Sequence, residues 1–410
     1  MAELWQPNYT DVIVMDIETH DQELGALGPG VYHDPDARVL GCGIWDSKTK
    51  VKKYYPLHHT DCSSEELARS RCELAEILAQ PTSKLLANAV YDLDWLENRE
   101  GLAVNGFIHD IQVAEPLLDQ YKFSYALDAL AKYYNVPGKK LVDIEAEAAK
   151  IDPTHKCYKN PQELLWLMPS KIVGDYCIGD LEATYAVFLK QMERIRAENM
   201  EELYECECNL VRICLMMRKN GILIDQKARE HAIFSVQEME TELQNGLFAS
   251  HGPFNINSSA QIAPILLDEG LKLPRTATGK YSVTKEILDK YSSQNKFCAD
   301  LMRVRALNKL RTTFLEKSID EHICKDGRLH GQFFPLRKDD AGTITGRWSG
   351  GNPNLQQIPR NDKQLGPMAR GMFVCDDGCW YGHTDYSQVE YRVFSHYARG
   401  WADGDKLDLL

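Results

Sequence analysis

A change in hydrophobic periodicity near residue 195 constrains the fold of this chain more than any other feature of its sequence. Before it, the apolar strand patterns "DVIVMDIET", "RVLGCGIWDS" and "VKKYYPLHH" precede helical patterns, whereas after it apolar residues recur mostly at helical spacing. Strands followed by mixed strands and helices indicate an α/β domain. At 410 residues the chain is too long for one compact core, so we expect two or three domains.

Four helical patterns follow the predicted strands of the first domain. The pattern "SEELARSRCELAEILAQ" has a serine before an acidic first turn and ends near Pro81, and "KLLANAVYDLDWLENREG" is closed by Gly101. Two more patterns, "SYALDALAKYYNV" and "DYCIGDLEATYAVFLKQMERIRAEN", come later. We therefore expect the first domain to span residues 1–198.

The remaining chain divides by composition. Long helical patterns such as "ELYECECNLVRICLMMRKNG" and "QKAREHAIFSVQEMETELQNGLFAS" predict a thumb-like helical domain over residues 199–328. Residues 329–410 are rich in Gly, Pro, Asn and basic residues, a composition that resists regular structure and brings backbone close to a ligand. Near its end, in "HTDYSQVEYRVF", Asp385 follows a strand-like run and Glu390 lies at the start of a predicted helix.

Composition excludes several classes of protein. With 44% hydrophobic and 26% charged residues, the chain is globular rather than disordered or fibrous. The N-terminus lacks the basic start and apolar run of a signal peptide, and no stretch approaches the ~18 consecutive apolar residues of a membrane span. We therefore expect a cytoplasmic protein with no membrane partner, whose twelve cysteines are reduced. The pairs Cys206 with Cys208 and Cys375 with Cys379 lack the further ligands that a zinc site needs.

The formal net charge of −13 does not exclude a nucleic-acid partner, because the local distribution of charge decides such contacts. Residues 303–347 carry ten basic and six acidic side chains inside an otherwise acidic chain. This basic window suits contact with phosphates, and on charge alone a solvated helix face explains it equally well.

Acidic residues at the end of the first predicted strand suggest a metal site. Asp16 and Glu18 lie two apart, so the period of a strand puts both carboxylates on one face of the sheet. Two neighbouring acids repel unless a positive charge lies between them, and a divalent metal ion supplies that charge. On this pair alone, two solvated acids at a strand end are the simpler interpretation.

Two further acids strengthen the metal interpretation. Asn88 and Asp92 lie four apart on a predicted helix, and Tyr176 and Asp180 do the same, so each pair shares one helix face. Both aspartates interrupt apolar surroundings, which indicates that they point into a site rather than into bulk water. The order D-x-E, then N-x-x-x-D, then Y-x-x-x-D is a specific constellation.

This constellation resembles the 3′-5′ exonuclease domain of the DEDD superfamily, in its tyrosine-bearing subclass. The whole chain is similar to the N-terminal part of a phage-type, DNA polymerase I-like enzyme of DNA polymerase family A. The segments "NGILID", "FNINSSAQIAPIL" and "LNKLRTTFL" resemble the family's thumb. "TGRWSGGNPNLQQIP" resembles its primer-template-binding stretch, and "DYSQVEYR" its first palm carboxylate motif.

The resemblance implies a fold and a chemistry for each part. It implies an α/β, ribonuclease H-like exonuclease domain, a helical thumb and the beginning of an α+β palm. Hydrolysis of a phosphodiester by two metal ions about 4 Å apart needs oxygen ligands, which suit Mg²⁺ or Mn²⁺. By the resemblance, Asp16, Glu18, Asp92 and Asp180 hold the two ions, and Tyr176 orients the attacking water. Asn88 is at most an outer contact to metal or substrate, and a structural cap explains it as well.

The resemblance also assigns roles in the third segment. Asp385 binds the metals of the polymerase site, and Glu390 lies under the sugar of the incoming nucleotide. Arg347, Asn354 and Gln356 match the stretch that contacts the primer-template duplex, where short polar side chains reach phosphates and minor-groove acceptors. An ordinary turn-rich loop is the alternative.

Three departures from the family pattern limit these expectations. We expect no 5′-nuclease domain ahead of residue 1, which would fit phage-type members. Trp348 with Gly350 and Gly351 replaces the small hydroxyl residues of many members, which puts the detailed contacts there in doubt. We expect this chain to lack the fingers and the second palm carboxylate, because neither motif occurs between Asp385 and Leu410.

We therefore expect the chain by itself to degrade DNA from single-stranded 3′ ends and to bind primer-template, but to synthesise DNA only if a second chain supplies the missing parts. If a phage encodes the protein, its place is the host cytoplasm. The alternatives are a non-catalytic DNA-clamping subunit of a split polymerase and an exonuclease that acts on RNA.

Overall fold

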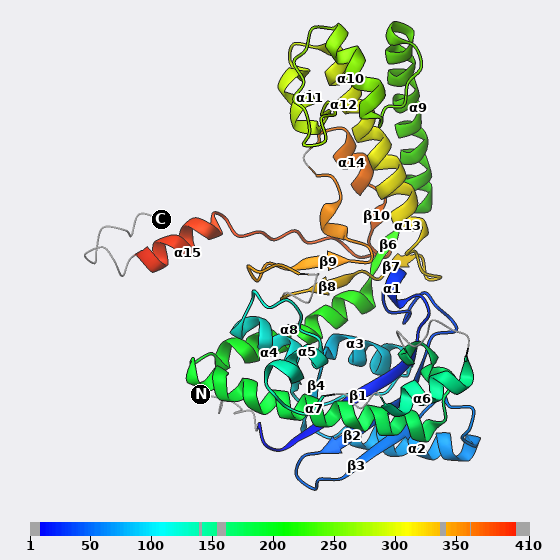
Figure 1. The fold of residues 1–410 in the computed structure, drawn as a ribbon, viewed down its shortest axis with the longest axis vertical. Coiled ribbons are helices and arrows are strands. Elements are labelled where there is room, and N and C mark those ends of the chain that lie inside the picture. The colour runs from blue at the N-terminus through cyan, green and yellow to red at the C-terminus, as the bar shows by residue number, and fades with distance from the viewer. Residues whose placement is uncertain (1–8, 139–141, 154–160, 337–341, 361, 399–410) are drawn as a thin grey trace. The chain divides into compact units, whose positions relative to one another are not determined.

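The structure is a computed structural model, and it describes residues 9–138, 142–153, 161–336, 342–360 and 362–398 (Figure 1). The chain divides into two units, Met1–Phe373 and Val374–Leu410, and each is described by itself. The first unit contains a five-stranded mixed sheet with helices against it and a second group of long helices. The fold is therefore mixed α/β, as predicted.

The five-stranded sheet has the order β3-β2-β1-β4-β5. Its strands are β1 (Val12–His20), β2 (Arg38–Asp46), β3 (Lys52–Pro56), β4 (Ser83–Leu86) and β5 (Ile108–Asp110). β1 pairs antiparallel with β2, and β2 pairs antiparallel with β3. β4 pairs parallel with β1, and β5 pairs parallel with β4. The three antiparallel strands are the three strand patterns predicted from the sequence.

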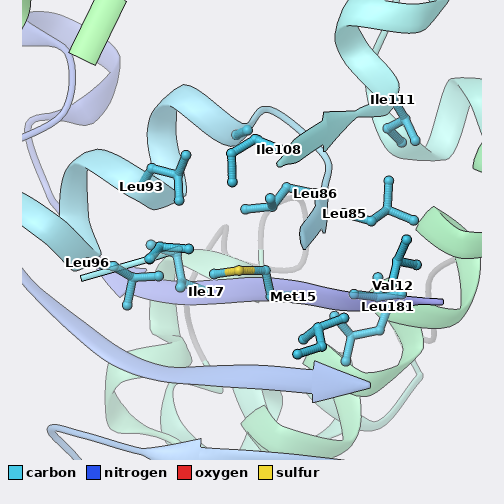
Figure 2. Packing of buried hydrophobic residues seen from close by; sticks show 14 of the residues in the cluster. Val12, Met15, Ile17, Leu85, Leu86, Leu93, Leu96, Ile108, Ile111 and Leu181 are labelled. Atoms are coloured by element: carbon cyan, nitrogen blue, oxygen red, sulfur yellow. The ribbon is translucent and has the colours of Figure 1, made fainter. Parts of the chain in front are cut away.

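β1 lies in the middle of the sheet, and its residues from Val12 to Met15 are buried because other structure covers both faces. Figure 2 shows Met15 and Ile17 packed among Leu86, Leu93 and Leu96. The pairing of β1 with β2 shifts register between Glu18 and Thr19, at the end where the predicted acidic pair lies. Such a bulge turns the strand and changes the direction of its side chains, and bulges are common beside active sites.

The helices around the sheet form in two groups. Those between the strands or shortly after them are α1 (Leu24–Leu27), α2 (Ser64–Leu78), α3 (Ala89–Leu93), the π-helix η1 (Asp94–Arg99), α4 (Ile111–Leu118), α5 (Leu127–Tyr133) and α6 (Val142–Ile151). The 3₁₀ helix η3 (Pro161–Leu167) leads into the long helices α7 (Ser170–Ala197) and α8 (Glu201–Asn220). The predicted serine cap of α2 is confirmed, because Ser63 and Glu66 form a reciprocal capping box.

α7 covers the face of the sheet formed by β1, β2 and β3 (Figure 1). Two glycines allow the close approach. A Cβ atom on Gly43 of β2 would lie 2.6 Å from the Sγ of Cys177, and one on Gly174 of α7 would lie 2.9 Å from the Cβ of Tyr54. Because any side chain at these positions would push the helix outward, glycine sets the distance between α7 and the sheet.

α8 packs on the sheet-containing core rather than on the helices that follow it. Tyr204, Cys208, Val211 and Leu215 of α8 belong to the same buried cluster as β1, and Gly221 ends the helix with a positive φ of 56°. The helix therefore follows the sequence pattern predicted for it and is also part of the first core.

The second group of helices has its own two buried clusters. It consists of α9 (Gln226–His251), α10 (Ser259–Asp268), α11 (Lys285–Ser292), α12 (Lys296–Lys309), the π-helix η4 (Leu310–Lys317) and α13 (Ser318–Asp320). α9 and α12 run beside each other (Figure 1), and Val236 and Leu307 are fully buried between these helices and η4. The prediction of long helices without a sheet in this stretch is confirmed for the described residues.

Short strands and helices complete the first unit. β6 (Ile222–Ile224) pairs with β7 (Arg328–Leu329), and the hairpin of β8 (Gln332–Phe334) and β9 (Ser349–Gly351) follows. The 3₁₀ helix η5 (Leu355–Gln357) and α14 (Leu365–Arg370) lead to β10 (Phe373–Val374), and the first unit ends at Phe373, within this short strand. This third stretch forms only short regular elements, as its composition predicts.

The second unit contains α15 (Val389–Ala398), with Glu390 in its first turn as predicted. Asp385 does not follow a strand, because residues 375–386 contain none, so that part of the prediction was wrong. The apolar residues before Asp385 include Trp380 and Tyr381, which are 93% and 62% exposed and therefore bury no strand face.

The sequence prediction for "KLLANAVYDLDWLENREG" was also wrong in its first half. Residues Ser83–Leu86 are strand β4, and Asn88 takes a left-handed backbone conformation with a φ of 74° before α3 begins. All four residues of β4 are buried, and a short, fully buried strand has the same apolar run as a buried helix segment. Asn88 and Asp92 consequently do not share a helix face.

Two other sequence expectations concern cysteines and membranes. Each cysteine that the structure describes is a free thiol, and Cys206 is exposed whereas Cys208 is buried, so these two do not form one ligand pair. Among the described residues, no helix is both long and apolar enough to cross a bilayer.

Candidate active site

The predicted acidic residues of the first domain come together where β1 meets α3 and α7. Asp16 pairs with Gly43 across β1 and β2, and this face of the sheet is the one that α7 covers. The Sγ atom of Cys177 on α7 lies 3.6 Å from the carbonyl oxygen of Asp16 and 3.7 Å from its Oδ2. One ligand atom each of Asp16, Glu18 and Cys177 lie within 4.8 Å of one another.

Asp92 reaches the same place from α3. The backbone N–H of Ile17, between the two acids of β1, donates a hydrogen bond of 3.1 Å to Asp92 Oδ1. Burial raises the pKa of Asp92 well above its usual value, and the negative charge of Asp16 raises it further. Asp92 is buried and Asp16 is half-buried, and two carboxylates that repel each other in this way are more readily charged together with a cation between them.

Asp180 adds the fourth carboxylate from α7. It is 3% exposed and follows Cys177 by three residues, so both side chains lie on one face of the helix. Burial raises the pKa of the Cys177 thiol well above its usual value, and the charges of Asp16, Glu18 and Asp180 all act in the same direction. Three predicted carboxylates therefore surround one thiol.

Tyr176 lies next to this group in sequence but packs in a different cluster. It is 4% exposed and belongs to a buried cluster with Leu40, Leu165 and Val173. The structure thus places the predicted tyrosine inside the domain, on the helix that carries Asp180.

Asp110 organises the turn before α3, although the sequence patterns did not single it out. Its carboxylate accepts hydrogen bonds from the backbone N–H groups of Asn88, at 3.0 Å, and Ala89, at 2.7 Å. These bonds fix the left-handed turn that starts the helix of Asp92. The signal was present in the sequence as an aspartate at the end of the short apolar run of β5, but its partners Ala89 and Asn88 lie 21 and 22 residues away.

A cleft of about 1140 Å³ opens beside the carboxylates. Its walls come from three separate parts of the first unit, and they include Glu18, Asn88, Tyr91, Trp166, Phe334 and Asn352. Gly28 lets Asn352, on another wall of the cleft, come close, because a Cβ atom on Gly28 would lie 2.8 Å from Nδ2 of Asn352. The volume exceeds the roughly 1,000 Å³ of the largest small-molecule pockets, so the cleft can hold an extended ligand.

Metal ions fit the donor set beside this cleft, of which Glu18 is a lining residue. The oxygens of Asp16, Glu18, Asp92 and Asp180 are the hard ligands that Mg²⁺ and Mn²⁺ prefer. Burial and the charge of Asp16 raise the pKa of Asp92, and a cation bound here would favour its charged form. The thiol of Cys177 is the exception in the set, and the sequence patterns did not identify it because a buried cysteine is usually a small hydrophobic residue.

The predicted duplex-contacting residues lie on and after the β8–β9 hairpin. Arg347 is exposed before β9. Asn354 caps η5, since its Oδ1 accepts a hydrogen bond of 3.1 Å from the backbone N–H of Gln356, and Gln356 Nε2 donates to the carbonyl of Trp348. These bonds give Asn354 and Gln356 a role in shaping the loop. Asp385 and Glu390 are exposed in the second unit.

Much of the basic window serves the helical fold. Arg311 pairs with Glu240 and Glu316, Arg303 pairs with Asp362, and Arg305 donates to the carbonyl of Ile256. Arg337 and Lys338 lie outside the described residues. The window is therefore more than a solvated helix face, and three of its arginines are occupied by contacts within the protein.

Comparison with known proteins places the chain in a family. Residues 226–401 match the sequence profile of DNA polymerase family A. The DNA-directed DNA polymerase of Pseudomonas phage M6 is 31% identical over 401 residues, which cover 94% of this chain and 58% of that protein. The chain belongs to DNA polymerase family A.

Other members of family A are similar over most of the chain. DNA polymerase DpoZ of Vibrio phage phiVC8 is 29% identical over 70% of this chain and 47% of that protein, and DNA polymerase I of Chloroflexus aurantiacus is 28% identical over 84% and 36%. The chain thus spans less than two thirds of the length of these relatives.

A solved structure has the same fold. The POL domain of Pol1 from M. smegmatis, in complex with DNA primer-template and dNTP, aligns with a TM-score of 0.69 at 21% sequence identity. The alignment covers 94% of this chain and 59% of that one.

Proposed function

We propose that the first domain, residues 1–198, is a ribonuclease H-like 3′-5′ exonuclease that removes nucleotides from DNA ends with two bound Mg²⁺ or Mn²⁺ ions. The observation that supports this most strongly is the convergence of Asp16, Glu18, Asp92 and Asp180 from one strand and two helices. Asp92 and Asp180 lie 76 and 164 positions after Asp16 in the sequence, and residues so far apart have no structural need to bring their charges together.

The ions would supply charge neutralisation of the phosphate, a nucleophile at neutral pH and stabilisation of the leaving 3′ oxygen. The chain's own residues prepare the site for them. The N–H of Ile17 holds Asp92 beside Asp16, and the Asp110 bonds fix the turn from which α3 carries Asp92 inward. Tyr176, on α7, would orient the attacking water.

The cleft supports a single-stranded substrate. Glu18 and Asn88 line it near the carboxylates, and Trp166, Tyr91 and Phe334 offer aromatic faces along its walls. Stacking of bases on aromatic side chains holds single strands without regard to sequence. A duplex end would have to separate before its terminal nucleotide reached Glu18.

We propose in addition that residues 199–328 act as a thumb and residues 329–410 as the first part of a palm, which together bind primer-template. Membership of family A and the fold shared with a polymerase domain support this assignment. In a complete family A polymerase, Asp385 would bind catalytic metal and Glu390 would select the sugar, while Arg347, Asn354 and Gln356 would contact the duplex. Template-directed DNA synthesis would then be the main activity and the exonuclease its proofreading function. The comparisons give no support to a second chain that carries the fingers, so we do not propose one.

A nuclease assay tests the first proposal. Purified protein and Mg²⁺ should release mononucleotides from a 3′-labelled DNA strand, and a chelator should stop the release. A matched RNA strand distinguishes the alternative, because an RNA-processing enzyme would degrade it at least as fast. Salt-dependent duplex binding without any release of nucleotides would instead favour a non-catalytic clamping subunit.

A further inference from the structure

One member of the candidate active site has no place in the proposed two-metal chemistry. Cys177 is fully buried, and its Sγ lies 3.7 Å from Asp16 Oδ2. Hard ions such as Mg²⁺ bind oxygen and leave a thiol unused. The position of this sulfur inside a group of metal-binding carboxylates therefore needs its own explanation.

The backbone holds the sulfur close to the carboxylates. Cys177 lies where α7 crosses β2, and Gly43 of β2 is directly opposite Asp16 of β1. A Cβ atom on Gly43 would lie only 2.6 Å from Sγ, so the absence of a side chain there is what lets the sulfur approach. Since helix and strand are both parts of the core, the sulfur cannot move far from Asp16 without repacking α7.

The three donor atoms have the spacing of a small metal site. One ligand atom each of Asp16, Glu18 and Cys177 lie within 4.8 Å of one another. Zinc binds sulfur at about 2.3 Å and carboxylate oxygen at about 2.0–2.2 Å, so two ligands of one ion are at most about 4.5 Å apart. A small inward movement of side chains is enough to bring all three donors onto one ion.

We infer that Asp16, Glu18 and Cys177 form a binding site for thiophilic divalent cations, of which Zn²⁺ and Cd²⁺ are examples. Soft sulfur ligands favour these ions over Mg²⁺ and Mn²⁺. Binding converts the thiol to a thiolate, and its proton passes to solvent. Because the same two carboxylates are shared, such an ion and the hard ions exclude each other.

A regulatory consequence follows, and it rests on the proposed exonuclease function. An ion held by Cys177 would displace a hard ion from Asp16 and Glu18, so thiophilic cations would inhibit nucleotide release even in the presence of Mg²⁺. The cation site itself does not depend on that function.

Cadmium alone is a suitable probe, because a cadmium–thiolate bond has a charge-transfer absorption in the ultraviolet that oxygen ligands do not give. The metal-free 410-residue chain is titrated with Cd²⁺. Its spectrum is compared with those of Cys177→Ser and of Cys206→Ser, a matched control on an exposed cysteine of α8. We expect Cys177→Ser to lose one thiolate's absorption and to bind Cd²⁺ more weakly by a factor on the order of ten or more. Cys206→Ser should match the wild type.

Competition gives a second measurement that needs no variant at Cys177. Excess Mn²⁺ should reduce the absorption of the wild type, since it takes the oxygens of Asp16 and Glu18, and Asp16→Asn should weaken the Cd²⁺ site although it keeps the thiol. Equal Cd²⁺ titrations of wild type and Cys177→Ser, or an absorption that saturating Mn²⁺ leaves intact, would overturn the inference.

Nuclease activity separates this inference from the proposed function. If the wild type shows the Cd²⁺ absorption but releases no nucleotides with Mg²⁺, the exonuclease proposal fails and the cation site stands. If it releases nucleotides but the Cd²⁺ titrations of wild type and Cys177→Ser are the same, the cation site fails and the exonuclease proposal stands.

Discussion

The backbone N–H of Ile17 donates a hydrogen bond of 3.1 Å to Oδ1 of Asp92, and this bond joins the central strand β1 to helix α3. Ile17 stands between Asp16 and Glu18, so the bond that anchors Asp92 also sets its distance from both acids. The period of two along the strand puts the carboxylates of Asp16 and Glu18 on one face, and a backbone N–H of the same strand binds the third carboxylate, that of Asp92. A hydrogen bond to a carboxylate favours the charged form, but burial and the charge of Asp16 outweigh it at Asp92.

Substitution of Asp92 by Asn should stabilise the metal-free protein and abolish nuclease activity. The pKa of Asp92 is raised in the folded state, so this carboxyl destabilises the fold above the ordinary pKa of aspartate, and the loss grows with pH until the raised pKa is passed. Asn keeps the acceptor for the Ile17 N–H and removes the charge. In chelator at pH 7, we expect the thermal midpoint of Asp92→Asn to be several degrees above the wild type.

The pH dependence supplies the check on this prediction. The advantage of Asp92→Asn should shrink as the pH falls below the raised pKa and vanish below the ordinary pKa of aspartate, because the carboxyl is then protonated in both the folded and the unfolded chain. A difference in midpoint that stays constant from pH 7 down to pH 4 would contradict the account, as would a variant less stable than the wild type in chelator.

His109 should make the fold sensitive to acid. It is buried in β5 among Phe107, Phe188 and Tyr204, and burial lowers its pKa to about 3. Between pH 6.5 and 3 the unfolded chain binds a proton that the folded chain does not, so the free energy of unfolding falls by up to about 1.4 kcal/mol per pH unit on acidification.

The variant His109→Phe removes this proton but also the hydrogen bond to Tyr204, at a cost of about 1 kcal/mol at neutral pH. Urea unfolding at pH 7 and pH 5 should show the variant to be less stable than the wild type at pH 7 and to lose less stability at pH 5. Equal losses in both proteins would show that His109 is protonated in the fold.

The buried pair Arg218 and Asp94 should be a large contributor to stability. Arg218 Nε lies 2.9 Å from Asp94 Oδ2, and the guanidinium also donates to the carbonyl of Pro29 beside the cleft. Asp94 additionally accepts a hydrogen bond of 2.8 Å from Tyr32. Arg218→Met leaves a buried carboxylate without its cation and should cost about 3–5 kcal/mol in urea unfolding.

An exposed ion pair is the control for this measurement. Lys53 pairs with Glu73 while half of its side chain is exposed, so Lys53→Met should lose far less stability than Arg218→Met. Similar losses in both variants would mean that Asp94 is satisfied without Arg218.

Gly43→Ala should loosen α7 from the sheet. The new methyl group would lie 2.6 Å from Cys177 Sγ and 3.2 Å from a methyl of Leu181, a clash that should cost about 1–3 kcal/mol. Adding Cys177→Ala removes the nearer contact and should restore part of the loss. Gly246→Ala is the matched control, since a Cβ there meets nothing within 4 Å in α9, and it should stabilise slightly. A double variant no more stable than Gly43→Ala would place the strain elsewhere.

The sequence predicted the parts of the site that local periodicity determines. Asp16 and Glu18 were recognisable because strand period puts them on one face, and Asp180 because helical spacing and apolar neighbours point it inward. The same reasoning failed for Asn88, where a short buried strand was taken for the start of a helix. An apolar run of four residues does not contain enough periods to distinguish the two.

Long-range contacts account for what the sequence did not show. Cys177 can lie close to Asp16 because Gly43, which is distant in sequence, has no side chain. Asp110 accepts a hydrogen bond from a turn that lies 21 residues earlier in the chain. The cleft wall of Phe334 and Asn352 comes from the third segment, whose composition indicates only that it has little regular structure. No local pattern encodes such pairings, because they depend on where α7 and the β8–β9 hairpin pack.

Release of 3′ nucleotides by the Asp16→Asn protein tests the central claim most directly. Asp16 lies on β1, close to both Asp92 and Cys177. Asparagine has nearly the same shape as aspartate but carries no charge. We expect wild type and Glu65→Gln, an exposed acid on α2, to digest 3′-labelled DNA with Mg²⁺ at equal rates, and Asp16→Asn to be slower by a factor on the order of 100 or more. Digestion by Asp16→Asn at the wild-type rate would contradict the assignment of the site.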